Sequence, residues 1–321
     1  MKGIHHIEVR NNRVVYKFDV ERNITIFRGN SATGKTTLID LIAAYDRLGD
    51  QSGIYLSCDK RCTVIVGNHW KEELERISDS IVFIDEGNRF IASQEFAAAI
   101  KNTDNYYVIA TRDPLHELPY SVDAIYGIKE DNRYGTVKPV YNSIFRLYGD
   151  RAVAGDFDTV ITEDSNSGYQ FFAHIFEEKG VRCISAEGKS NIFKLIMDNK
   201  AHKSLVIADG AAFGSEMERV CQVQNDNPGS VLLYLPESFE WLILKSDILK
   251  DSEISDILVD PSNYIESGEY FSWEQFFTKL LTDKTNGTYL QYNKSSLNSN
   301  YFKEEIVKKI LRIITIRILT E

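Results

Sequence analysis

The stretch Gly29-Asn30-Ser31-Ala32-Thr33-Gly34-Lys35-Thr36 decides the fold of the first half of the chain. It has a glycine, four further residues, a second glycine, a lysine and a hydroxyl residue, the order found in loops that cradle phosphates. The residues before it, Ile24 to Phe27, predict a buried strand, and those after it, Thr37 to Ala44, predict a helix. Because such a loop joins a strand to a helix, both neighbours agree with the motif.

The residue types in this stretch suit a polyphosphate and a divalent cation. Gly29 and Gly34 let the backbone turn so that successive N–H groups face one concavity, and the following helix adds the positive end of its dipole. Lys35 can reach the β- and γ-phosphates, while the Thr36 hydroxyl can complete the coordination shell of Mg²⁺. We therefore expect ATP and Mg²⁺ as ligands, with the nucleotide held by Gly29, Asn30, Ser31, Ala32, Thr33, Gly34, Lys35, Thr36 and Thr37. The competing interpretation is a glycine-rich turn with an incidental lysine.

Length and composition indicate a packed protein with two domains. The chain has 321 residues, of which 43% are hydrophobic and 12% aromatic, and a composition break near Tyr148 to Gly155 divides it. We expect a phosphate-loop domain in residues 1–150 and a second α/β domain in residues 151–321. Neither a stretch of about eighteen apolar residues nor the apolar core of a signal peptide is visible in the sequence, which favours a cytoplasmic protein without a membrane partner.

Net charge and cysteine content limit the kinds of ligand and cross-link that the chain can have. The formal net charge of −10 argues against a surface that attracts nucleic acid everywhere, although it leaves room for a local basic groove. The four cysteines are too few for a disulfide framework: Cys58, Cys62, Cys183 and Cys221. Cys58 and Cys62 could form half of a metal site, but no second close pair completes it, so we interpret them as ordinary reduced thiols.

A second chemical landmark is Ser80-Ile81-Val82-Phe83-Ile84-Asp85-Glu86. The apolar run predicts a strand buried on both faces, and an aspartate at its carboxyl end would lie beside the phosphate loop, where it can bind Mg²⁺. Glu86 would then polarise an attacking water. The alternative is a strand end that carries solvated acids.

The segment Tyr106 to Arg112 predicts another buried strand that ends near the same cleft. Thr111 would orient the water or sense the γ-phosphate, and Arg112 would stabilise transferred charge within the subunit or in a neighbour. Alternatively, Arg112 pairs with Asp113 in a surface turn, and we leave both interpretations open.

The first half resembles a minimal P-loop ATPase, with Asp85 in the second Walker motif. A serine-glycine-glycine signature of ABC-type ATPases is absent between Asp40 and Ser80, and this spacing is too short for the insertions of SMC-type proteins. The resemblance implies ATP hydrolysis. ATPases with a water-activating glutamate often act as oligomers, so we expect a homo-oligomer.

The second half predicts a further α/β unit. Three short segments predict strands: Asp158 to Asp164, Val181 to Ser185 and Ser204 to Asp209. Tyr169 to Lys179 and Asn191 to Met197 have helical spacing. Glu163 and Asp209 lie at the carboxyl ends of two of these strands. They would converge on one edge of a parallel sheet, where a divalent cation could neutralise them.

Five short segments carry a further resemblance: Glu163 with Asp164 to Gly168, Glu187 to Asn191, Asp209-Gly210-Ala211, Pro236 to Glu240 and Tyr292 to Asn298. Together they resemble the Toprim domain of topoisomerases and primases, and above all the OLD-type nucleases and related anti-phage defence proteins that join an ATPase to a Toprim domain. The resemblance implies a metal site formed by Glu163 and Asp209, with a further ligand from Glu237 or Glu240, and DNA or RNA as substrate. The alternative is a plain Rossmann-like sheet whose strand ends meet water.

One residue departs from the Toprim pattern. Toprim proteins usually have a second aspartate after the third strand, and here that position is Ala211. Losing a ligand weakens metal binding, so the domain could instead bind a partner protein or nucleic acid without cutting, under a regulatory or scaffold ATPase. Lys189 and Lys294 could each contact a phosphate backbone or lie in a solvated turn. A small-molecule kinase is a third hypothesis, although no arginine cluster supports it.

The last segment, Tyr301 to Glu321, places isoleucines at helical spacing. It predicts a closing helix that packs on a domain, with a dimer or partner contact as the alternative.

Overall fold

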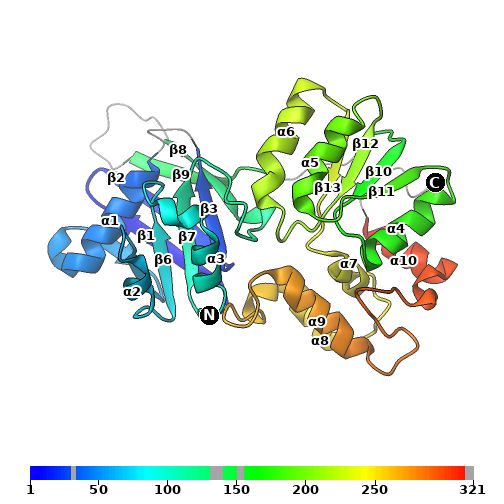
Figure 1. The fold of residues 1–321 in the computed structure, drawn as a ribbon. Helices are drawn as coiled ribbons and strands as arrows, with labels where there is room; N and C mark the ends of the chain where they lie inside the picture. Colours follow the sequence, from blue (N-terminus) through cyan, green and yellow to red (C-terminus); the bar gives the residue numbers. More distant parts are fainter. Residues whose placement is uncertain (30–33, 131–139, 150–154, 315–321) are drawn as a thin grey trace. The chain divides into compact units, whose positions relative to one another are not determined.

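The computed structural model describes residues 1–29, 34–130, 140–149 and 155–314 (Figure 1). The chain forms two compact units. Unit 1 comprises Met1–Gly149 and Asp260–Ser272, and unit 2 comprises Asp150–Val259 and Trp273–Glu321. Both units are α/β, as the sequence predicts. Within the described ranges, every helix is too short or too polar to cross a lipid bilayer.

Unit 1 is built on a nine-stranded sheet with the order β4-β1-β2-β9-β8-β3-β7-β6-β5. The strands are β1 His5–Arg10, β2 Val14–Val20, β3 Ile24–Arg28, β4 Tyr55–Ser57, β5 Arg61–Val64, β6 Ser80–Ile84, β7 Tyr106–Thr111, β8 Ile125–Glu130 and β9 Val140–Arg146. The sequence predicts a β-hairpin over residues 4–20 at the edge of a parallel sheet. The hairpin is present as β1 and β2, and the parallel pairing holds for the run from β8 to β5. Antiparallel pairs join β1 to β2, β1 to β4 and β8 to β9.

The first hairpin shows why the sheet is mixed. Three residues connect β1 to β2, and the Asn11 side-chain oxygen accepts hydrogen bonds from the backbone N–H groups of Arg13 (2.8 Å) and Val14 (2.9 Å). Such a turn reverses the chain at once and therefore gives antiparallel strands, whereas parallel neighbours need a long crossover.

Helices cover both faces of the parallel run. Alternate residues of β6 face opposite sides: Ile81 and Phe83 pack in the cluster that contains helix α1 (Lys35–Leu48), and Val82 and Ile84 pack with the opposite helices. Those opposite helices are α2 (Trp70–Leu74) and α3 (Gln94–Ile100). Short 3₁₀ segments in this unit are η1 Gly49–Ser52, η2 Arg89–Ala92, η3 Val122–Ala124 and η5 Pro261–Asn263.

The sheet of unit 1 curls around α1. Strands β4 and β5 stand at opposite ends of the strand order, yet only three residues, Cys58 to Lys60, connect them. The two edges must therefore approach each other, and residues from both sides of the curl join α1 in one hydrophobic cluster.

A segment from the second half of the sequence completes unit 1. The buried amino group of Met1 contacts the Glu266 carboxylate and the Ser267 hydroxyl. The Asn23 side chain donates to the backbone carbonyls of Ser267 (3.2 Å) and Tyr270 (2.8 Å). These bonds attach residues 260–272 to unit 1, although they follow residues of unit 2 along the chain.

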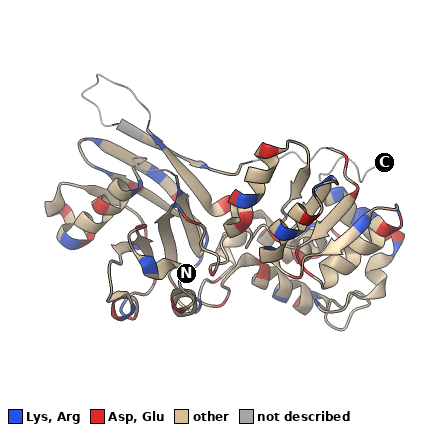
Figure 2. Ribbon diagram, turned by 45° about the horizontal axis from the view of Figure 1, so that its top comes forward, with Lys and Arg blue, Asp and Glu red and all other residues tan. Residues whose placement is uncertain are grey.

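Unit 2 contains a four-stranded, fully parallel sheet with the order β11-β10-β12-β13. Its strands are β10 Thr159–Thr162, β11 Arg182–Ser185, β12 Ser204–Ile207 and β13 Val231–Tyr234. Its helices are α4 Ser167–Glu177, α5 Lys189–Asp198, η4 Gly214–Glu216, α6 Met217–Asp226, α7 Phe239–Lys245, α8 Ser252–Val259, α9 Trp273–Thr285, η6 Ser299–Phe302 and α10 Glu304–Ile313. The expected closing helix corresponds to α10, and residues 315–321 lie outside the described part. Both signs of charge occur on the helices of each unit (Figure 2).

Candidate nucleotide site and acidic cluster

The two ends of the candidate phosphate loop have the backbone that its glycines permit. Gly29 follows β3 with φ of 153°, and Gly34 precedes α1 with φ of 90°, a conformation that other residues adopt only under strain. The Lys35 side chain is buried, and its amino group donates to the Gly29 carbonyl (2.6 Å). Thr36 and Thr37 are exposed at the start of α1. Four of the expected nucleotide-binding residues lie outside the described part of the chain: Asn30, Ser31, Ala32 and Thr33.

Tyr16 fixes the second glycine from the neighbouring strands. Its hydroxyl donates to the Gly34 carbonyl (3.0 Å), and a Cβ placed on Gly34 would lie 2.9 Å from that hydroxyl. Asn142 pairs with Tyr16 across β2 and β9 and is 1% exposed, and among the described residues its side-chain oxygen has no hydrogen-bond partner. Tyr16 of β2 therefore holds Gly34 in place and leaves no room for a larger side chain at that position.

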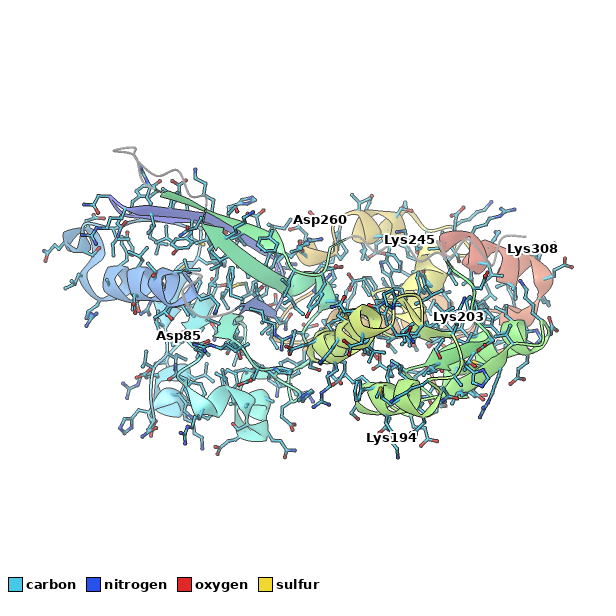
Figure 3. All side chains as sticks on the ribbon, turned by 90° about the horizontal axis from the view of Figure 1, so that it is seen from above. Asp85, Lys194, Lys203, Lys245, Asp260 and Lys308 are labelled. Atoms are coloured by element: carbon cyan, nitrogen blue, oxygen red, sulfur yellow. The ribbon has the colours of Figure 1, made fainter. Side chains whose placement is uncertain are left out.

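The sheet order gathers the other predicted residues of unit 1. Strands β3, β7 and β6 are parallel neighbours, so Lys35, Arg112 and Asp85 follow them at the same edge. Asp85, labelled in Figure 3, directly follows β6 along the chain. Burial lowers the pKa of Lys35, while the nearby charges of Glu86 and Asp85 raise it and that of Arg112 lowers it. The two acids and the two cations therefore share one electrostatic site.

Arg112 pairs with Glu86. Its guanidinium donates to the Glu86 carboxylate at 2.6 Å and 3.1 Å, and this hydrogen bonding lowers the pKa of Glu86. The Thr111 hydroxyl, by contrast, is used within its own turn, where it donates to the Asp113 carbonyl (2.9 Å) and accepts from the Asp113 N–H (3.1 Å). Neither of the two open interpretations for Arg112 anticipated Glu86 as its partner, and the charge of Asp113 raises the pKa of Arg112 less than Glu86 does.

The predicted acids of unit 2 meet at the carboxyl ends of two adjacent strands. Glu163 follows β10 and Asp209 follows β12, and the Glu163 carboxylate accepts from the Asp209 backbone N–H (2.9 Å). A small cavity of about 20 Å³, room for roughly one water, opens beside them. We call the charged residues that line it or lie next to it the acidic cluster: Glu163, Asp164, Asp209, Glu240, Glu274 and Lys294.

Burial and crowding favour the protonated forms of Glu163, Asp164 and Asp209. Burial raises the pKa of Glu163 to about 7 and that of Asp209 well above its ordinary value, and the neighbouring carboxylates add to the Asp209 shift. The amino group of Lys294 lies 2.5 Å from a Glu274 oxygen and 3.9 Å from a Glu240 oxygen. Burial lowers the pKa of Lys294, but these carboxylates raise it more, so the lysine stays charged.

A hydrogen-bond chain supports Glu240, which is 2% exposed. The Tyr292 hydroxyl lies 2.6 Å from the Glu240 carboxylate and 2.6 Å from the Ser167 hydroxyl, and the Ser167 N–H donates to the Lys294 carbonyl (2.9 Å). The segment around Tyr292 therefore joins α7 to the start of α4.

The expected metal ligands are only partly brought together. Glu163, Asp209 and Glu240 line the same cavity, whereas Glu237 does not, and its carbonyl accepts the Ala211 N–H (3.3 Å). Among the described residues, no three His, Cys, Asp or Glu side chains are arranged to hold a metal ion. The sequence also missed Glu274, which the fold brings to the cluster from the start of α9 and which has no motif around it.

Two lysines singled out in the sequence have protein partners. Lys189 donates to the Ala212 carbonyl (2.9 Å) at the start of α5, and Lys294 belongs to the acidic cluster. Neither interpretation offered for Lys294, a phosphate contact or a solvated turn, includes its ion pair with Glu274.

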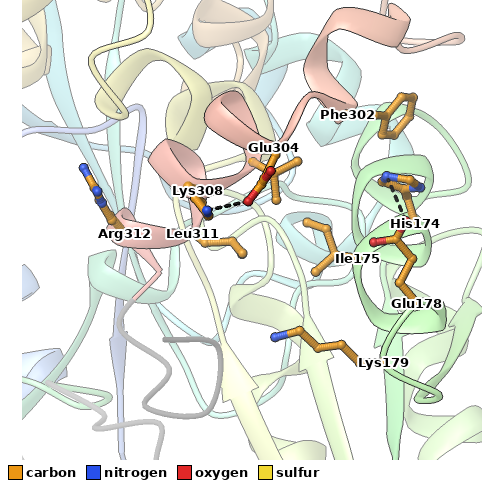
Figure 4. Close-up of a pocket in the computed structure, with 10 residues that line it drawn as sticks. His174, Ile175, Glu178, Lys179, Phe302, Glu304, Lys308, Leu311 and Arg312 are labelled. Carbon is orange, nitrogen blue, oxygen red and sulfur yellow. Dashed lines mark hydrogen bonds and ion pairs between the residues drawn. The ribbon is translucent and has the colours of Figure 1, made fainter. Parts of the chain in front are cut away.

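A larger cavity of about 770 Å³ lies elsewhere in unit 2, between α4 and α10 (Figure 4). Its charged side chains pair along each helix, His174 with Glu178 and Lys308 with Glu304. These pairs are spaced like ordinary surface pairs of helices, so we assign the chemistry of unit 2 to the smaller acidic cavity.

Comparison of the chain with protein-family models gives no match, and comparison with curated proteins gives none either.

Proposed function

We propose that unit 1 binds ATP with Mg²⁺ and hydrolyses it. The observation that carries this proposal is the convergence of Lys35 with Asp85 and Glu86 at one edge of the parallel strands, beside the two glycines that flank the phosphate loop. In this proposal Lys35 binds the phosphates, Thr36 and Asp85 hold Mg²⁺, and Glu86 orients the attacking water.

Glu86 must leave Arg112 to play that role. A carboxylate held in an ion pair with a guanidinium is a poor proton acceptor, because the pairing lowers its pKa. When a nucleotide binds, the Arg112 side chain would leave Glu86 and contact the γ-phosphate, because carboxylate and phosphate oxygens accept hydrogen bonds from the same guanidinium group. This exchange frees the base and stabilises the transferred charge in one movement.

We further propose that unit 2 is a Toprim-like domain that acts on DNA or RNA with a divalent metal, under the control of the ATPase, as in OLD-type defence proteins. The support is the meeting of Glu163, Asp209 and Glu240 in one cavity at the carboxyl edge of a parallel sheet. A dication there would displace protons from Glu163 and Asp209, whose pKa values burial raises.

A second candidate is a regulatory ATPase whose unit 2 binds a partner without cutting. The ion pair between Lys294 and Glu274 favours it, because a lysine already supplies positive charge to the acidic cluster. Ala211, in place of a carboxylate, favours it too.

ATP turnover and ATP binding test unit 1. Lys35→Ala should lower turnover at least about 100-fold by weakening phosphate binding, and Glu86→Gln should lower it similarly while ATP still binds. Lys101→Ala, at an exposed lysine that follows α3, is the matched control and should leave both unchanged. Equal turnover in wild type and Lys35→Ala would refute the proposed site.

Incubation with plasmid DNA or RNA, ATP and Mg²⁺ or Mn²⁺ separates the two candidates for unit 2. Cleavage that disappears in Glu163→Ala supports the metal-dependent domain. Absence of cleavage under all combinations, with ATP turnover intact, supports the regulatory candidate.

A further inference from the structure

Cys58 and Cys62 lie together at the three-residue connection between β4 and β5 (Tyr55–Ser57 and Arg61–Val64). Cys58 follows β4, and Cys62 is the second residue of β5. Both sulfurs contact the backbone of the same residue: the Lys60 N–H donates to the Cys58 sulfur (3.5 Å), and the Cys62 thiol donates to the Lys60 carbonyl (3.9 Å). The Cys58 thiol also donates to the Asp59 carboxylate (3.6 Å), and the Cys62 side chain is near enough to lower the pKa of Cys58.

The two thiols differ in exposure. Cys62 is 4% exposed and belongs to the hydrophobic cluster around α1, whereas Cys58 is half-buried at its border. Both line a cavity of about 340 Å³ together with Lys60, Arg61 and Asp46, and the two cations are paired with acids, Arg61 with Asp46 and Lys60 with Asp79. A small reagent can therefore reach Cys58 first, with Cys62 directly behind it.

The pKa values of the two thiols also shift in opposite directions. The Cys62 side chain lowers the pKa of Cys58 most, against the effect of burial, and the Lys60 N–H lowers it further. Asp59 opposes the shift, but its carboxylate is held by His5, whose ring nitrogen lies 2.9 Å away. The Cys58 side chain and burial raise the pKa of Cys62. A thiolate is the nucleophilic form of cysteine, so Cys58 is the reactive thiol of the pair.

We propose that Cys58 and Cys62 form a peroxide-sensitive dithiol, in which Cys58 reacts with a hydroperoxide and Cys62 resolves the product as a disulfide. In the first step the Cys58 thiolate attacks one peroxide oxygen. The O–O bond breaks, hydroxide or an alkoxide leaves, and Cys58 becomes a sulfenic acid. In the second step the Cys62 sulfur attacks the Cys58 sulfur, its proton and the sulfenic hydroxyl leave as water, and the S–S bond forms. The two thiols lose two electrons, which the peroxide gains.

Peptide mapping of the wild-type chain tests the proposal directly. Trypsin cleaves after Lys60 and Arg61, so it separates the two cysteines unless a disulfide holds their peptides together. After treatment with hydrogen peroxide and then iodoacetamide, we expect the two peptides to be linked and to separate on reduction. Cys221, a single thiol that is also half-buried, is the internal control, and we expect Cys58 to be oxidised at least about tenfold faster.

Two variants sharpen the result. In Cys58→Ser, Cys62 should stay available to iodoacetamide after denaturation, because it has no reactive partner. In Cys62→Ser, Cys58 should accumulate as a sulfenic acid that dimedone traps. Oxidation of Cys58 and Cys221 at equal rates, or oxidation of wild-type Cys58 to a sulfinic acid without linkage to Cys62, would overturn the proposal, and both outcomes are read on wild-type protein even if Cys62→Ser does not fold.

Discussion

Glu163→Gln should change how the stability of unit 2 depends on pH. Burial raises the pKa of Glu163 from the ordinary 4.5 to about 7 in the folded protein. Between these values the folded chain binds a proton that the unfolded chain has lost. The stability that this carboxyl contributes is therefore fully present below pH 4.5 and disappears as pH rises through 7.

The pKa change sets the size of the effect. At about 1.4 kcal/mol per pKa unit, deprotonation of Glu163 costs the folded state up to about 3 kcal/mol at pH 8. Glutamine has nearly the same shape and never carries the charge. The free energy of unfolding of Glu163→Gln minus that of wild type should therefore increase by about 2 to 3 kcal/mol from pH 5 to pH 8.

Urea denaturation at a series of pH values provides the measurement. Two of the three tryptophans, Trp241 and Trp273, lie in unit 2 and report its unfolding by fluorescence. Glu305→Gln is the matched control, because Glu305 is exposed in α10 of unit 2 and should give a difference that changes little with pH. A pH-independent difference for Glu163→Gln as well would refute the raised pKa and, with it, the crowding of the acidic cluster.

The same experiment with Mn²⁺ or Mg²⁺ decides what neutralises the acids. A dication that binds only the folded state stabilises it by about 2.7 kcal/mol at 100 times its dissociation constant. At pH 8 we expect this gain in wild type and its loss in Glu163→Gln if unit 2 holds a metal. If the dication does not increase the free energy of unfolding of wild type, the result supports the regulatory candidate.

Three further substitutions probe individual contacts. Tyr292→Phe removes a hydrogen-bond donor from the buried Glu240 carboxylate and should lower the free energy of unfolding by about 1.5 to 3 kcal/mol in urea denaturation. Gly210→Ala places a Cβ 2.6 Å and 2.9 Å from two backbone carbonyl oxygens, so it should destabilise unit 2 by about 1 to 3 kcal/mol, measured as a lower melting temperature. Arg112→Ala removes the hydrogen bonds that lower the pKa of Glu86 and should move the acidic limb of the ATPase pH profile to higher pH; an unchanged limb would show that another group sets it.

The sequence predicted local elements where one residue pattern dominates. The buried strands that end at Asp85 and Thr111 were placed correctly because both of their faces are covered, which requires continuous apolar runs. The antiparallel hairpin of β1 and β2 could be predicted from the polar turn at Asn11 and Asn12, whereas the antiparallel pair of β8 and β9 could not, since these strands follow no apolar run as clear as those of the central strands.

Long-range contacts explain most of the missed site residues. Acids that directly follow parallel strands lie at the same edge of the sheet. The sequence was therefore enough to predict that Glu163 and Asp209 lie together. Glu274 comes from a helix more than sixty residues later, and its neighbours carry no chemical motif. The return of residues 260–272 to unit 1 similarly depends on hydrogen bonds to Asn23 and Met1 that no local pattern reveals.

The two candidates for unit 2 differ most at Asp209. Burial, and then the charges of Glu274, Glu163 and Glu240, raise the pKa of this carboxyl, so its ionisation needs a nearby positive charge. Lys294 supplies one charge, and its shortest contact is with Glu274 rather than with Asp209. Lys189 also lowers the pKa of Glu163, but two monovalent cations do not balance the five carboxyls of the acidic cluster, so full ionisation of these acids needs a dication. Protons and metal ions therefore compete for the same oxygens, and a metal-dependent unit 2 would bind its ion with an affinity that rises as pH increases toward about 7 and levels off once Glu163 is deprotonated.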